Sequence, residues 1–175
     1  SDKVVKAILD VFPDADIYTL VAKKDVCDEL GIPWEKVHTS FMQKMPLGTK
    51  KHRAYLPLFP FAIEQFDLRG YDVVISSSHC VAKGVLTKAD QLHICYCHSP
   101  IRYCWDMYNE YLEESHLDKG FKSWLVRLML HPIRQFDAIA GSRVDYYISN
   151  SDYVGQRIRK TYRRKATTIH PNIDI

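Results

Sequence analysis

The chain is 175 residues long, and with 46% hydrophobic and 12% aromatic residues it can bury one sizeable core without disulfide or metal cross-links. Its formal net charge of +3 is too small to indicate nucleic-acid binding by itself. No apolar run approaches the ~20 residues that cross a bilayer, so we expect any membrane contact to be peripheral.

The five cysteines indicate a reducing compartment. Their number is odd, three of them lie in apolar or aromatic surroundings, and no secretory signal precedes them. We therefore expect a cytoplasmic protein, with a peripheral position on the inner face of the cytoplasmic membrane as the alternative location.

The first part of the chain alternates helices with strands. Apolar residues at helical spacing predict a helix over 4–12, which ends at Pro13. The run at 16–21 predicts a strand, residues 25–30 a second short helix, and residues 36–39 a second short strand.

Residues 41–66 mix large apolar side chains with three prolines and the basic cluster Lys50-Lys51-His52-Arg53. This composition predicts broken helices with an amphipathic surface. Such a surface fits core packing with a solvated face. A sharper alternative is a membrane-surface or lipid-acceptor patch.

The second part of the chain continues the alternation. Short β-prone runs predict further strands at 72–76, 92–97, 145–149 and 166–169. Helical apolar spacing predicts a helix over 121–130, which Pro132 either kinks or separates from a second helix, and another helix after the cap residues Asn150-Ser151. The pattern predicts an α/β protein with an open, mostly parallel, Rossmann-like sheet and helices on both faces.

Residues 94–106, ICYCHSPIRYCWD, concentrate three cysteines and a histidine. A zinc site fits poorly, because the period of two in a strand places Cys95 and Cys97 on one face and His98 on the other. A thiol nucleophile fits poorly as well, because neighbouring residues in a strand point apart and His98 could not serve Cys97 as a base. We therefore expect buried structural cysteines and no bound metal.

His98 is the candidate functional residue of this stretch. It is the last residue of the predicted strand before Ser99, at the carboxyl end, where parallel strands open onto a binding cleft. The pairs Lys83-Gly84 and Asn150-Ser151 occupy the carboxyl ends of two other predicted strands, where backbone amides can approach a ligand.

Four residues beyond His98 support two interpretations. They are Arg102, Tyr103, Trp105 and Asp106. They form either a polar, stacking wall of the kind that carbohydrate or nucleotide rings favour, or a hydrogen-bonded first turn of a helix.

Five blocks of the sequence, in this order, resemble the amino-terminal domain of bacterial glycosyltransferase family 4 enzymes, which have the GT-B fold. The blocks are VFPDADIYTL, RAYLPLFPFAIEQFDLRGYDVVISSSHCVAKGVL, QLHICYCHSPIRYCWDMYNEYL, RVDYYISNSDYVGQRIRKTY and HPNIDI. They extend over nearly the whole chain.

The resemblance implies a retaining transferase that moves a hexose, with mannose as one candidate, from a nucleotide-sugar to a polysaccharide, lipopolysaccharide or lipid-linked glycan acceptor. In such enzymes the acceptor binds mainly in the amino-terminal domain and the donor mainly in a carboxyl-terminal one. The nucleotide-sugar is a substrate, so no cofactor is implied.

The resemblance also implies roles for individual residues. His98 matches the family's histidine near the transferring sugar, which contacts its hydroxyls or supports the developing oxocarbenium charge. The cleft residues implied with it are Lys83, Gly84, Ser99, Arg102, Tyr103, Asp106, Asn150 and Ser151.

The chain departs from the family pattern at both ends. The family begins with a central strand and a glycine-rich loop, whereas Ser1-Asp2 directly precedes the first predicted helix. We therefore expect one domain over 1–170, the start of an interdomain linker at 171–175, and no donor-binding domain, so that the isolated chain does not turn over nucleotide-sugar. Two strand edges would be exposed, and we expect a strand from another chain, a strand-swapped oligomer or residues preceding Ser1 to cover them.

Two other functions remain open at this stage. One is a non-catalytic α/β module that binds a sugar or nucleotide without reacting. The other is nucleic-acid binding through the basic residues at 157–165, which needs only that one helix and which we disfavour.

Overall fold

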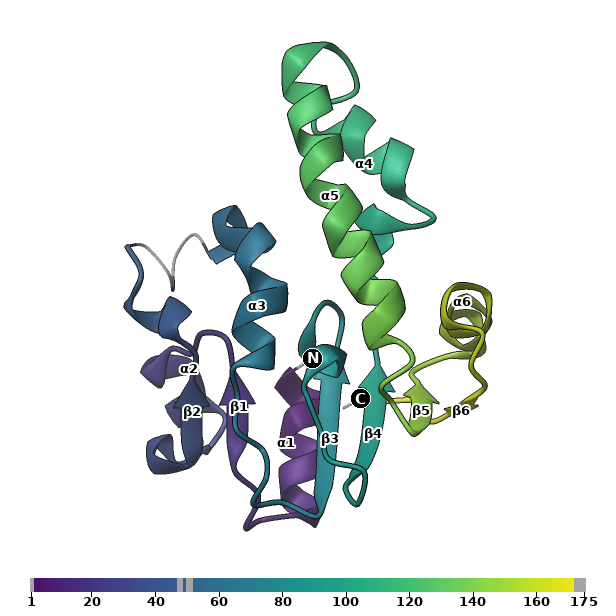
Figure 1. Ribbon diagram of the computed structural model, residues 1–175. Helices are drawn as coiled ribbons and strands as arrows, with labels where there is room; N and C mark the ends of the chain where they lie inside the picture. The colour runs from purple at the N-terminus through teal and green to yellow at the C-terminus, as the bar shows by residue number, and fades with distance from the viewer. Residues whose placement is uncertain (1, 47–48, 50–51, 172–175) are drawn as a thin grey trace.

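Parallel strands in two sheets form the framework of the protein (Figure 1). The computed structural model describes residues 2–46, 49 and 52–171. In this part of the chain a four-stranded sheet has the order β3-β4-β5-β6 and a two-stranded sheet pairs β1 with β2, with every pairing parallel. The strands are β1 (Ile17–Thr19), β2 (Val37–Thr39), β3 (Val73–Ser78), β4 (Leu92–Cys97), β5 (Tyr146–Ser149) and β6 (Ala166–Thr168).

Helices separate the strands along the chain. The α-helices are α1 (Asp2–Val11), α2 (Lys24–Glu29), α3 (Phe59–Glu64), α4 (Tyr108–Glu114), α5 (Gly120–Ala140) and α6 (Asp152–Tyr162). Short 3-10 helices are η1 (Trp34–Lys36), η2 (Phe41–Lys44), η3 (His52–Leu58), η4 (Ala82–Gly84) and η5 (Arg102–Cys104). The predicted α/β class with a parallel sheet flanked by helices is thereby confirmed.

Strand β4 lies inside the larger sheet, between β3 and β5. Cys95 and Cys97 are fully buried in a core cluster beneath α6, together with Tyr147 and Ile158. Their shared face is the one that the period of two predicted. A strand that is covered on both faces consists almost entirely of apolar residues, which explains the sequence LHICYC of β4.

The two sheets are separated by a cavity of about 1030 Å³. Residues of β1 and β3 line it, and so do Val5, Ile8 and Leu9 of α1. Within the described residues, β1 and β3 are each the terminal strand of their sheet. The sheet is therefore interrupted between β1 and β3, which agrees with the expectation that a central strand is missing and leaves two strand edges unpaired. The apolar face of α1 borders the gap.

Contacts at one end of this gap join β1 to the loop before β3. The Tyr71 hydroxyl donates to Asp16 at 2.5 Å and lies 3.1 Å from the Tyr18 hydroxyl. The Tyr18 ring stacks on His38 of β2 with a centroid distance of 4.7 Å. These contacts hold the two-stranded sheet beside the larger one, although no strand of the described residues joins the two sheets.

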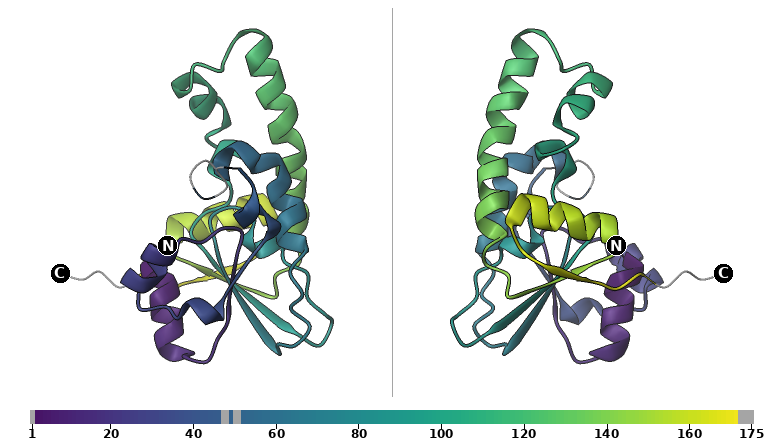
Figure 2. Two further views of the ribbon diagram at one scale, coloured as in Figure 1. Left: turned by 90° about the vertical axis from the view of Figure 1, so that its left-hand side faces the viewer. Right: turned by 90° about the vertical axis from the view of Figure 1, so that its right-hand side faces the viewer.

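Pro132 lies within a single helix, since α5 is continuous from Gly120 to Ala140. With α4 it forms an arm that projects from the sheet-containing body (Figures 1 and 2). The predicted stripe of Phe121, Trp124, Leu125 and Leu128 lies on this helix, but all four side chains are exposed. The spacing thus predicted the helix correctly, and the tertiary structure leaves this face of it uncovered.

Residues 41–66 form η2, η3 and α3, as the prediction of broken helices expected. Lys50 and Lys51 of the predicted basic cluster lie outside the described residues, and so do residues 172–175 of the predicted linker. In the described part of the chain, no helix combines the length and the apolar character that crossing a membrane requires.

Candidate functional site

The carboxyl end of β4 places His98 at the edge of the larger sheet. Its backbone N–H donates to the carbonyl of Ser78 at 2.8 Å, which extends the β3–β4 pairing by one residue. Its Nε2 lies 2.9 Å from Oγ of Ser77, and its ring meets the Tyr96 ring edge-on at 5.3 Å. The half-buried imidazole is therefore held in one orientation by a hydroxyl from the neighbouring strand.

Arg157 of α6 connects two of the predicted cleft residues. Its guanidinium donates to Oγ of Ser99 at 2.9 Å and forms an ion pair with the exposed carboxylate of Asp106. It also lies over the ring of Tyr153, 5.6 Å from the centroid. The guanidinium of Arg157 thus joins the turn that contains Ser99 to the turn that contains Asp106. Ser99 directly follows the candidate residue His98 in the chain.

Asn150 and Ser151 follow β5 and begin α6. The Ser151 hydroxyl accepts a hydrogen bond from the Val154 N–H at 3.2 Å, which confirms the predicted helix cap. The Asn150 carbonyl lies 3.2 Å from Nδ1 of His170, which follows β6. These residues lie at the same edge of the sheet as His98, because β4, β5 and β6 are parallel.

Lys83 and Gly84 lie in η4, beneath the helices. The Lys83 side chain is 1% exposed; it donates to the Cys80 carbonyl at 2.9 Å and pairs with Asp137 of α5. The Gly84 N–H donates to the Val81 carbonyl at 2.7 Å, and a Cβ at this position would lie 2.3 Å from the Phe136 ring. These two residues hold α5 against the sheet, and the amide of Gly84 is used within the protein.

The turn at η5 separates the residues of the expected polar wall. Arg102 is exposed. The Tyr103 hydroxyl points inward and lies 3.4 Å from Sγ of Cys80, and burial raises the pKa of this phenol above its ordinary value. The Trp105 indole donates to Asp137 at 2.7 Å. Tyr103 and Trp105 therefore anchor the turn in the interior, while Arg102 and Asp106 reach the surface.

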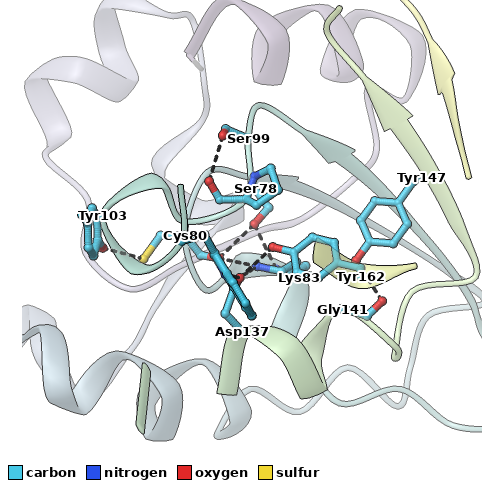
Figure 3. A network of polar contacts seen from close by, with 11 residues as sticks. Ser78, Cys80, Lys83, Ser99, Tyr103, Asp137, Gly141, Tyr147 and Tyr162 are labelled. Atoms are coloured by element: carbon cyan, nitrogen blue, oxygen red, sulfur yellow. Dashed lines mark hydrogen bonds and ion pairs between the residues drawn. The ribbon is translucent and has the colours of Figure 1, made fainter. Parts of the chain in front are cut away.

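Asp137 is the centre of a buried polar network (Figure 3). Its carboxylate is 0% exposed and accepts hydrogen bonds from the Trp105 indole, the Tyr162 hydroxyl at 2.8 Å and the Lys83 ammonium. Burial, together with the charge of Asp137, raises the pKa of Tyr162. The network joins η4, α5 and α6 to Trp105, the residue directly after η5.

Two of the buried cysteines, Cys97 and Cys104, carry no sign of reactive chemistry. A hydrogen bond with Cys95 and burial together raise the pKa of Cys97, and burial raises the pKa of Cys104 to about 12. A thiol in this state is not a nucleophile near neutral pH. Within residues 2–46, 49 and 52–171, no three histidine, cysteine or acidic side chains are grouped so that they could hold a metal ion.

Two residues that matter for this geometry were not among the sequence candidates. Ser77 positions the His98 ring. The sequence feature that could have indicated Ser77 is the run of three serines, Ser76-Ser77-Ser78, at the end of a predicted strand. Arg157 belongs to the basic run at 157–165, which the sequence offered as a contact for nucleic acid. Its partners Ser99 and Asp106 lie 58 and 51 residues away in the sequence, so local spacing could not reveal the contact.

No protein-family model, curated protein or solved structure matches this chain.

Proposed function

We propose that the chain is the acceptor-binding half of a retaining glycosyltransferase, with the cleft at the carboxyl edge of β3, β4 and β5. The observation that carries the proposal is the oriented imidazole of His98, held by Ser77 beside the turn that Arg157 links to Ser99 and Asp106. The order of the five sequence blocks supports the same conclusion.

The chemistry proposed for this site needs no protein nucleophile. Retaining transfer develops positive charge on the sugar ring, and positioning with electrostatic stabilisation supplies most of the catalysis. His98 would donate to or accept from the sugar hydroxyls at the reacting centre. The guanidinium of Arg157 has five N–H groups, and the hydrogen bonds to Ser99 and Asp106 use two of them. The remaining N–H groups would donate hydrogen bonds to an oxygen of the acceptor glycan or to a phosphate of the nucleotide-sugar.

The donor is proposed to be a nucleotide-sugar bound mainly by a second domain, and the acceptor a polysaccharide or lipid-linked glycan bound by this chain. The 175-residue chain alone would then bind acceptor without transferring sugar. Measurable transfer by this chain alone would contradict the division of roles.

The proposal is tested in a polypeptide that joins this chain to a donor-binding domain, by screening nucleotide-sugars and glycan acceptors for transfer. His98→Ala should lower turnover on the order of 100-fold with little change in unfolding free energy. Ser77→Ala should lower turnover less, and Ser77→Thr, which keeps the hydroxyl, should restore it. Unchanged turnover in His98→Ala would remove this residue from the site.

A binding module without catalysis is the competing function. It predicts that the chain binds a sugar or nucleotide, that His98→Ala weakens this binding, and that no donor yields a transferred product. Titration calorimetry with acceptor glycans and with nucleoside diphosphates, run beside the transfer assay, separates the two functions.

A further inference from the structure

Helix α5 has two faces with different surroundings. Ser123, Leu130 and Ile133 are buried, and the last two pack in one core cluster with Ile101 and Cys104. On the opposite side of the helix lie Phe121, Trp124, Leu125 and Leu128, at the i, i+3, i+4, i+7 spacing of a helical stripe, and we call these four residues the outer stripe. Phe121 is 73% exposed, Trp124 57% and Leu128 56%. A soluble surface seldom gathers so many large apolar side chains on one helix face.

The position of the outer stripe makes it accessible. The amino-terminal half of α5 and α4 form the arm that projects from the body, and α5 begins near the tip of this arm (Figures 1 and 2). The Phe121 and Trp124 rings stack on each other with a centroid distance of 6.0 Å. Aromatic rings of this kind favour the boundary between water and lipid, since Trp adds a polar N–H to a large apolar ring.

The other helix of the arm lies across α5 from the outer stripe. Arg127 and Arg134 of α5 lie over the ring of Tyr108 in α4, with distances to the centroid of 5.4 and 4.6 Å. Val126 also packs on this inner side. The acidic residues of α4 are therefore separated from the outer stripe by the α5 helix itself. They are Glu110, Glu113 and Glu114.

The charge near the outer stripe is positive on balance. Lys122 is exposed within the same turn as Phe121, and Lys119 immediately precedes the helix. One acidic residue, Asp118, lies beside them, with its carboxylate 3.9 Å from the ammonium group of Lys119, whose side chain is 92% exposed. The one acidic residue of α5 is Asp137, which is buried and already paired with Lys83. Apolar and aromatic side chains flanked by lysines are the composition of helices that lie in the plane of an anionic bilayer surface. Helix α5 of a second copy of the chain would present no exposed acidic side chain to pair with these lysines, because its acidic residue, Asp137, is buried.

We propose that the outer stripe of α5 docks on a membrane surface that contains anionic lipid, with Phe121, Trp124 and Leu128 entering the headgroup boundary and Lys119 and Lys122 contacting phosphates. This inference goes beyond the proposed transferase activity and does not depend on it, because it concerns the arm and not the strand ends. The arm would hold the chain at the surface by one helix face.

The test is co-sedimentation of the full chain with vesicles of phosphatidylcholine alone and of phosphatidylcholine mixed equally with phosphatidylglycerol. We expect binding to the mixed vesicles that weakens with added salt. The double variant Trp124→Ser/Leu128→Ser should lose about tenfold or more of this binding, since two apolar side chains leave the interface. The matched control is Leu86→Ser, which removes a side chain that is 50% exposed on the body and should bind as the parent does.

Tryptophan fluorescence gives a second readout. The chain has three tryptophans, and Trp124 is the exposed one on the arm. Vesicles should shift its emission to shorter wavelength, and Trp124→Phe should abolish the shift while sedimentation persists. Lys119→Glu/Lys122→Glu should remove the preference for phosphatidylglycerol. Circular dichroism and thermal unfolding check that each variant is folded.

Three results would overturn the proposal. One is equal sedimentation of the parent and Trp124→Ser/Leu128→Ser. Another is loss of sedimentation in Leu86→Ser to the same extent. The third is no binding to either vesicle together with a concentration-dependent dimer, seen in analytical ultracentrifugation, that Trp124→Ser/Leu128→Ser dissociates, since this would assign the stripe to a second copy.

Discussion

Lys83 and Asp137 form an ion pair in the interior of the protein although 54 residues separate them in the sequence. Their side chains are 1% and 0% exposed. Burying two charges is costly, and the pair is tolerated because each group has further partners: Lys83 donates to the Cys80 carbonyl, and Asp137 accepts from Trp105 and Tyr162. The pair therefore fixes how α5 lies against η4 and α6.

Removing one member of this pair should destabilise the protein strongly. Asp137→Ala leaves the buried Lys83 ammonium without its carboxylate, so we expect a loss of about 3 to 5 kcal/mol in the free energy of unfolding. The double variant Lys83→Met/Asp137→Leu, which removes both charges, should lose less than Asp137→Ala. Urea denaturation measures both. The exposed pair of Lys88 and Asp90 provides the control, and Asp90→Ala should change stability little. Equal losses for Asp137→Ala and Asp90→Ala would show that the buried pair has no such role.

Gly141 should not tolerate a side chain. A Cβ there would lie 2.4 Å from the ring of Tyr162, which cannot move away because its hydroxyl is bound to Asp137 and its ring stacks on Tyr147. Gly141→Ala should cost about 1 to 3 kcal/mol through overpacking. Gly70→Ala is the matched control, since nothing lies within 4 Å of a Cβ at that position. Thermal unfolding compares the two, and the same melting temperature for both variants would be inconsistent with the close contact.

The stability of the protein should fall in mild acid because of His93. This side chain is fully buried in β4, its Nε2 lies 2.9 Å from the Ser76 hydroxyl, and burial lowers its pKa. The unfolded chain takes up a proton below its ordinary pKa of about 6.5 while the folded chain does not. The contribution of His93 to folding stability is therefore constant above that pH and decreases as the pH falls from about 6.5 toward the lower folded-state pKa.

Urea unfolding at a series of pH values measures this dependence. His93→Gln should weaken the decrease in stability below about pH 6.5, because it removes the group that titrates. His131→Gln, at an exposed position of α5, should leave the profile as it is in the parent. Identical profiles for the parent and His93→Gln would exclude the buried imidazole as the cause.

The cavity between β1 and β3 should accept an extended strand. Two parallel strand edges face it, and the apolar residues Val5, Ile8 and Leu9 of α1 border it. We expect amides on the cavity side of β1 and β3 to exchange hydrogen quickly in dilute solution and to become protected at high chain concentration, as another copy supplies a strand. Amides of β4 serve as the internal control. Exchange that does not change with concentration, in a chain that stays monomeric, would argue against a strand from a second copy.

Much of the architecture could be predicted from local patterns. The strand over Leu92–Cys97 was expected from an apolar run, and the burial of Cys95 and Cys97 on one face follows from the period of two. The start of α6 was expected from Ser151, whose hydroxyl does cap the helix. Such features depend on residues within a few positions of one another, which is why the sequence reveals them.

The candidate site could be predicted only in part. The position of His98 at a strand end followed from the order of residues, but its contact with Ser77 depends on the register between β3 and β4. Lys83 was expected beside a cleft and is instead buried against α5. Arg157 was read as one charge of a basic run, and it joins Ser99 to Asp106 because α6 packs beside the turn after β4.

By itself, the sequence determined the α/β alternation, the parallel strands, the faces of β4 and the strand-end location of His98, because periodicity, caps and turn residues act over a few positions. The tertiary structure alone decided which charges are buried and which helix face stays uncovered. These properties depend on which distant elements meet. Apolar residues at helical spacing form part of the core on α6, where a neighbouring strand covers them. Residues at the same spacing form an exposed surface on the outer stripe of α5.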